Sequence, residues 1–165
     1  MNENSKYFPI PQPDELTIRE KEDAMGAYLM MFATVAIGIP FPVLNLVAAL
    51  IYLYINRNKG RFVYFHSLQS LYSQIPVTLL NAGLVVWFLI CLIPDVQFTN
   101  EFIAYAIMTG IADIIYLIFS LIAAAKARKG IFYYFVFFGK LAYHQAYLNR
   151  ELTRKKHVNA PPPTM

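Results

Sequence analysis

The apolar residues of this chain are gathered into long runs instead of being spread along one face of short helices. Three runs cover residues 24–55, 75–93 and 102–125. A helix buried in a soluble core would interrupt such a run with polar positions every turn or two, whereas about 20 apolar residues cross a hydrocarbon layer about 30 Å thick. The pattern therefore predicts an all-α, polytopic membrane protein.

Pro40 and Pro42 divide the first run into two halves. As one helix the run would be about 48 Å long, whereas Ala24 to Ile39 and Phe41 to Asn56 would each measure about 24 Å. Proline disfavours the interior of a helix. We therefore expect a short N-terminal helical hairpin that turns at the prolines, and one kinked, tilted span is the alternative.

The stretch from Arg61 to Ile93 begins with an aromatic and basic segment and becomes an apolar helix, the first of two expected full transmembrane helices. At 100° per residue, its polar side chains fall within roughly 140° of arc: His66, Gln69, Ser70, Ser73, Gln74 and Asn81. An unpaired polar group in hydrocarbon costs several kcal/mol, so this stripe must face protein or water. His66 follows Arg61 closely, and we expect it at the membrane surface in a capping or headgroup-binding role.

The second full span, Phe102 to Ala125, carries a polar stripe about 80° wide, formed by Tyr105, Thr109, Asp113, Tyr116 and Ser120. A carboxylate in the middle of a span is costly, so a partner is expected for Asp113. The candidates are Gln74, Asn81, Tyr116 and His66. The two stripes are expected to face each other, either hydrogen-bonded together or bordering a hydrated path. For Asp113 three roles are open: a structural hydrogen bond between helices, the lining of a permeation path, or contact with another subunit.

Positive charges indicate which ends of the spans are cytoplasmic. Arg57, Lys59 and Arg61 precede the second run without an acidic neighbour, and Lys126, Arg128 and Lys129 follow the third, whereas the loop between these spans has no Lys or Arg. These six residues and Lys140 are expected at lipid headgroups. Residues 131–147 start with six aromatics in eight positions and are too short to cross, so we expect an interfacial aromatic and basic segment, with a re-entrant segment as the alternative.

The pattern divides the chain into a polar arm (1–23), a membrane domain (24–147) and a basic, proline-rich cytoplasmic tail (148–165). Within the arm, a helix start is expected near Asp14 or Thr17. The formal net charge is +4. Because the basic residues adjoin membrane segments, they favour anionic lipid over nucleic acid as a partner.

Candidate chemistry is sparse. Cys91 is the only cysteine and lies in an apolar run, so a buried thiol is expected and a disulfide or thiolate cluster is excluded. The three histidines have no metal-ligand spacing. Ser67, Ser70 and Ser73 lie near a histidine, but no acid orients it and no nucleophile elbow is present. We expect no metal, no cofactor and no enzymatic activity.

The segment Phe65 to Ser70 reads aromatic, His, small, apolar, Gln, small after a basic spacer. In this it resembles the Tic-type (Tic-twenty-like) import-channel subunit of the chloroplast inner envelope and its small bacterial relatives. A second similarity is the order Ala123, Ala124, Lys126, Gly130, aromatics at 133 and 134, then Gly139, Lys140 and Leu141. The chain departs from these relatives at Val136 and Phe137, where a proline is common. The resemblance implies four membrane helices, both termini on the cytoplasmic side, and participation in protein transport.

The sequence therefore predicts a non-enzymatic protein of the bacterial inner membrane, an accessory or channel-forming subunit of a protein-transport or assembly complex. Its partners would be the bilayer, anionic lipids and other membrane-protein subunits. A small-molecule or ion permease lined by the polar stripes is one alternative. A structural or lipid-interacting membrane protein is the other.

Overall fold

The computed structural model describes residues 10–33, 42–93 and 97–149, and these residues form helices and connecting segments without a strand. The predicted all-helical fold is confirmed. The elements are α1 (Ile18–Leu29), a 3₁₀ turn η2 (Met30–Phe32), α3 (Pro42–Asn56), α4 (Arg61–Cys91), α5 (Asn100–Arg128), α6 (Phe138–Tyr143) and a π-helical continuation η3 (His144–Asn149).

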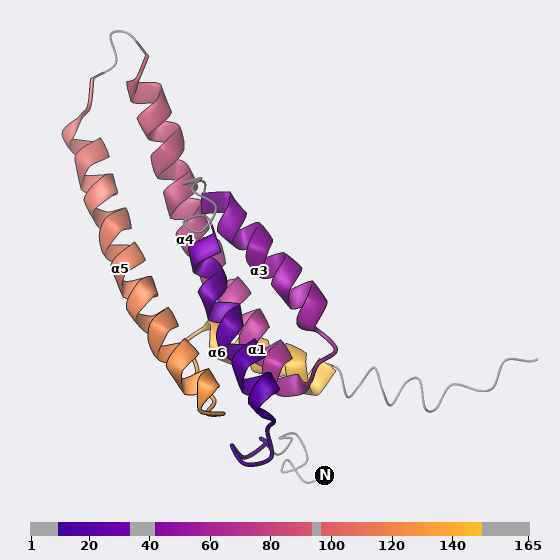
Figure 1. Ribbon diagram of the computed structural model, residues 1–165. Helices are drawn as coiled ribbons and strands as arrows, with labels where there is room; N and C mark the ends of the chain where they lie inside the picture. Colours follow the sequence, from indigo (N-terminus) through magenta and orange to yellow (C-terminus); the bar gives the residue numbers. More distant parts are fainter. Residues whose placement is uncertain (1–9, 34–41, 94–96, 150–165) are drawn as a thin grey trace, which may run out of the picture.

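The two longest helices, α4 and α5, run antiparallel along the length of the molecule (Figure 1). With 31 and 29 residues they are about 46 Å and 44 Å long, and both are long and apolar enough to cross a membrane. The Thr99 hydroxyl caps the start of α5 by accepting from the Phe102 amide at 3.3 Å. Lys126 and Arg128 lie in the last turn of α5, where cations complement the helix dipole.

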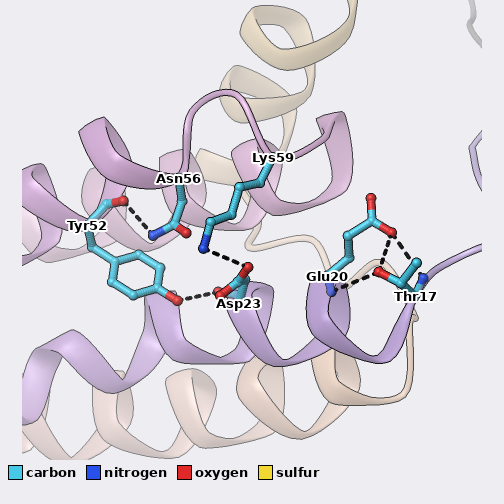
Figure 2. A network of polar contacts seen from close by, with 6 residues as sticks. All are labelled: Thr17, Glu20, Asp23, Tyr52, Asn56 and Lys59. Atoms are coloured by element: carbon cyan, nitrogen blue, oxygen red, sulfur yellow. Dashed lines mark hydrogen bonds and ion pairs between the residues drawn. The ribbon is translucent and has the colours of Figure 1, made fainter.

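A capping box begins α1. The Thr17 hydroxyl accepts from the Glu20 amide at 3.2 Å, and the Glu20 carboxylate accepts from the Thr17 amide at 3.0 Å (Figure 2). These bonds satisfy two backbone donors that no helical carbonyl can reach. The helix therefore begins at Ile18, six positions before the apolar run expected to start at Ala24.

Helices α1 and α3 lie antiparallel. The Tyr52 hydroxyl donates to the Asp23 carbonyl at 2.7 Å, and the Lys59 ammonium lies 2.9 Å from the Asp23 carboxylate, so the end of α3 returns to the first half of α1 (Figure 2). A Cβ at Gly26 would collide with the Tyr52 ring and hydroxyl. The hairpin prediction is confirmed and the single kinked span is excluded. The turn itself, expected at the prolines, lies outside the described residues.

The hydrophobic core lies at the end of the molecule that carries the basic loops. There α1 is packed against both α4 and α5. Alanines on α5 leave room for this close approach. The cluster consists of Leu16, Ala24, Tyr28, Phe62, Ala123, Ala124 and Ala127.

Gly130 ends α5 with φ of 77°, a conformation in which glycine avoids the strain of a side chain. Residues 131–137 are not helical, and α6 then lies across the basic end of the bundle (Figure 1). This segment, expected to be interfacial, is only partly on the surface: Ala142, Ala146 and Tyr147 are buried against Phe65 and Leu68 of α4. The predicted arm from residue 1 and the predicted tail to residue 165 lie partly outside the described residues.

Candidate functional site: a polar network between the helices

The first part of the network joins α4 to α1 through His66, Gln69 and Tyr28, all buried. The Gln69 amide nitrogen donates to the Tyr28 hydroxyl and to the Tyr133 carbonyl, both at 2.8 Å, and its oxygen accepts from the Phe135 amide at 3.3 Å. The backbone groups at 133 and 135 fix the orientation of this amide, because one accepts and the other donates. Gln69 therefore ties α4 to α1 and to the segment after α5.

The side chains of Tyr28 and His66 are joined by a hydrogen bond. The Tyr28 hydroxyl lies 2.8 Å from His66 Nδ1 and also accepts from the Gln69 amide. The other ring nitrogen, Nε2, has no hydrogen-bond partner among the described residues and lies in a ring cluster with Phe62, Phe65 and Phe132.

His66 was expected at the membrane surface, and that prediction is wrong. Its side chain is fully buried. The reason is that Tyr28 of α1 and the Phe132 ring after α5 cover it, and neither contact can be foreseen from the sequence around residue 66. A headgroup-binding role for His66 is thereby excluded.

Hydroxyl groups continue the network along α4. The Ser70 hydroxyl donates to the Ala27 carbonyl of α1 at 2.7 Å, and the Gln74 amide donates to Ser70 at 3.3 Å. Ser73 donates to the Ser70 carbonyl at 2.9 Å. This half of the α4 stripe is therefore bonded to α1 through Ser70. Ser73 and Gln74 also interact with Tyr116 of the α5 stripe, so α4 directs polar groups to both neighbouring helices.

Further along, α4 and α5 contact each other directly. The Asn81 amide donates to the Asp113 carboxylate at 2.7 Å and to the Val77 carbonyl at 3.0 Å. The Tyr105 hydroxyl donates to the Leu80 carbonyl at 2.9 Å. Of the four partners considered for Asp113, the structure places Asn81 in contact.

Several buried polar atoms between the helices have no hydrogen-bond partner within the described residues. They are Gln74 Oε1, Thr109 Oγ1, Tyr116 Oη, Ser120 Oγ and Ser67 Oγ. Unpaired polar atoms in a buried setting weaken a fold. The Tyr116 hydroxyl nevertheless interacts with Ser73 and Gln74 of α4 and with Ser120 of α5, so this middle part is a polar cluster between the two helices with incomplete hydrogen bonding.

The basic residues predicted at lipid headgroups lie near the starts of α1 and α4 and the end of α5. Lys59 pairs with Asp23. The Arg57 guanidinium lies 4.3 Å from the centre of the Tyr54 ring, and that of Arg61 lies 5.8 Å from the centre of the Tyr147 ring. The side chains of Lys126, Arg128, Lys129 and Lys140 are exposed.

The arrangement offers hydrogen bonding between helices more than chemistry. Within residues 10–33, 42–93 and 97–149, His, Cys, Asp and Glu side chains nowhere gather in groups of three or more that could hold a metal ion. Cys91 is buried, as predicted.

Sequence reasoning missed Tyr28 and the backbone groups at 133 and 135. Tyr28 lies in the apolar run of the first helix, and a tyrosine in such a run gives no signal of its own. The backbone groups give none at all. Only Gln69, whose amide has two N–H donors and an acceptor oxygen, indicated that a partner was required.

The comparison with known families overturns the predicted resemblance. The family model of the magnetosome magnetite crystal formation proteins (MamF/MmsF) matches residues 20–141, more than half of the 165-residue chain. No curated protein and no solved structure matches the chain.

The Tic-type resemblance is therefore wrong. It rested mainly on Phe65 to Ser70, and the structure explains these residue types by packing. Phe65, His66, Leu68, Gln69 and Ser70 are all buried between the helices. Short patterns of buried residues do not carry function from one family to another. With two helices long enough to cross a membrane and a match over most of its length, the chain belongs to the magnetosome magnetite crystal formation family, MamF/MmsF.

Proposed function

We propose that this protein is a non-enzymatic, multi-pass protein of the magnetosome membrane that contributes structurally to magnetite crystal formation. The observation that carries this proposal is the family match over residues 20–141. The helical interior supports it, because polar side chains of α4 connect this helix to α1, to α5 and to the segment after α5.

The charges support one orientation for this protein. Arg57, Lys59, Lys126 and Arg128 lie at one end of α4 and α5, and the loop around residues 97–99 lies at the other. By the positive-inside rule the basic end is cytoplasmic. The first helix begins at that end, in keeping with a cytoplasmic N-terminus.

A structural role is favoured over a permease by the use of the polar groups. Asn81 and Asp113 bond to each other, both N–H groups and the oxygen of the Gln69 amide have partners, and Ser70 bonds to the backbone of α1. A permeation path would leave such groups directed at a hydrated passage. The protein-transport role depended on the Tic-type resemblance and has no other support. Association with other membrane-protein subunits and with anionic lipids remains part of the proposal.

The test uses a magnetite-forming host that lacks this gene and is complemented with variants. Electron microscopy measures crystal size and number, and carbonate-washed magnetosome membranes are probed for the protein. The wild-type chain should remain in the membrane fraction and restore the crystals. Asp113→Leu should also restore them if the interior is structural, since an apolar residue of similar shape often replaces a buried charge without loss.

Two outcomes contradict the proposal. Unchanged crystals in the deletion host would exclude a role in their formation. Loss of crystals with Asp113→Leu at normal protein level and unchanged thermal stability would favour the permease, and solute flux into vesicles containing the purified protein would then be measured.

A further inference from the structure

A groove with apolar walls lies between the two long helices. Its volume is about 490 Å³, within the range of small-molecule sites. Pro76 and Val77 of α4 form one wall and Ala112 and Phe119 of α5 the other, and residues 133–138 line the groove as well.

The mouth of the groove is surrounded by exposed apolar side chains. Val136 is 90% exposed and Phe137 is 80% exposed, and Phe119 on the wall is 46% exposed. In water such a surface costs roughly 25 cal/mol for each Å². Both walls belong to helices long enough to cross a membrane, and in a bilayer we expect a mouth of this composition to face hydrocarbon.

A positive charge lies in line with the groove. Lys126 follows Phe119 by seven residues, as Phe119 follows Ala112, and seven residues make nearly two full turns. The three residues therefore share one side of α5, with Lys126 about 10 Å beyond Phe119 toward the basic end. The Lys126 side chain is exposed.

The dimensions agree with half of a bilayer. Ala112 and Lys126 are about 21 Å apart along the helix axis, and half of a bilayer including its headgroup region is about 20–22 Å thick. With Lys126 at headgroup level, the far end of the groove reaches the bilayer midplane.

We propose that this groove binds one acyl chain of an anionic phospholipid, with its phosphate at Lys126. A transmembrane helix of a second copy fits less well: a helix is about 10–12 Å across, so about 490 Å³ holds only about one turn of it. An acyl chain is narrower and follows the groove along its length. The proposal does not depend on the role in crystal formation.

Native mass spectrometry of the full chain, released from nanodiscs of phosphatidylglycerol and phosphatidylcholine in equal amounts, tests the site. The wild type should retain one phospholipid, mainly phosphatidylglycerol. Ala112→Trp fills the groove and should reduce the retained fraction at least tenfold. Ile114→Trp is the matched control, since Ile114 is exposed on the other side of α5, and it should retain lipid as the wild type does.

A second pair of variants tests the charge. Lys126→Ala should lower the preference for phosphatidylglycerol about fivefold, as expected for one basic residue at an anionic surface. Arg128→Ala, about 200° away around the helix, should leave the preference unchanged. If Ala112→Trp does not fold, Val77→Phe blocks the opposite wall and should give the same loss.

Equal lipid retention in the folded groove variants and the wild type would overturn the proposal. So would a wild type that carries no lipid, and a dimer that Ala112→Trp dissociates would then identify a second copy as the occupant.

Discussion

Asn81 of α4 and Asp113 of α5 are joined by a hydrogen bond of 2.7 Å near the middle of the two longest helices. Both side chains are half-buried. The Tyr105 hydroxyl of α5 donates to the Leu80 carbonyl of α4 at 2.9 Å, one residue before Asn81. These two bonds together fix the relative register of α4 and α5.

A double-mutant cycle measures this pair. Asn81→Leu leaves the Asp113 carboxyl without its partner, so it should destabilise the protein more than Asp113→Leu does, and Asn81→Leu with Asp113→Leu should be no worse than Asn81→Leu alone. The expected coupling is about 0.6–1.7 kcal/mol, the range found for hydrogen bonds between membrane helices. Unfolding in mixed detergent micelles gives the free energies. Strictly additive single effects would show that the pair contributes nothing.

Replacement of Gln69 tests the connection between α4, α1 and the segment after α5. Gln69→Leu removes the partners of the Tyr133 carbonyl and the Phe135 amide, and each buried backbone group left unpaired costs about 1–3 kcal/mol. We expect a loss of about 2–4 kcal/mol in the free energy of unfolding. Ser67→Ala is the control: its buried hydroxyl has no partner among the described residues, so its removal should change stability little or improve it.

Two glycines in helices should respond in opposite ways to alanine. A Cβ at Gly139 would lie 2.8 Å from Tyr134 Cδ1, 2.9 Å from the Tyr134 backbone and 2.9 Å from Gln69 Oε1. Gly139→Ala should therefore cost about 1–3 kcal/mol through overpacking. Gly110 has no atom within 4 Å of such a Cβ, so Gly110→Ala should stabilise α5 by about 0.5–1 kcal/mol. Thermal unfolding of the two variants side by side checks both signs, and a stabilising Gly139→Ala would show that α6 does not pack as described.

Cysteine labelling tests the orientation of the membrane helices. In a Cys91→Ala background, single cysteines are placed at Lys59 and Gln97, at opposite ends of α4 and its following loop. A membrane-impermeant maleimide added to sealed vesicles of one orientation should label only one of the two. Equal labelling from the same side would contradict a membrane-crossing α4.

The periodicity of polar residues predicted which sides of the helices are polar, but not what covers them. Asn81 was one of four partners considered for Asp113, because both residues lie in the middle of long spans, and the sequence did not choose among the four. The partners of Gln69 could not, because the Tyr133 carbonyl is 64 positions away and belongs to backbone that gives no sequence signal. His66 was placed at the surface for the same reason: its cover comes from α1 and from the non-helical segment after α5.

The prolines at 40 and 42 predicted two helices correctly, whereas the start of the first depended on the Thr17 cap and not on hydropathy. Residues 18–23 belong to the predicted arm, in which a helix start near Asp14 or Thr17 was expected, and the cap at Thr17 agrees with that expectation. They are helical because the capping box forms and because one side of this turn packs against α5, with Ala24 buried in the same core. A hydropathy profile alone would not place the start of α1 at Ile18.

The unequal lengths of the helices give the molecule different widths at its two ends. Near the basic end, α1, α3, α6 and the segment of residues 131–137 pack around α4 and α5, whereas toward the opposite end the two long helices extend beyond the other described helices (Figure 1). Once inserted, the chain displaces more lipid from one leaflet than from the other. A protein of this shape fits best where its broader end lies in the convex leaflet. We therefore expect it to suit a small, strongly curved vesicle better than a flat membrane.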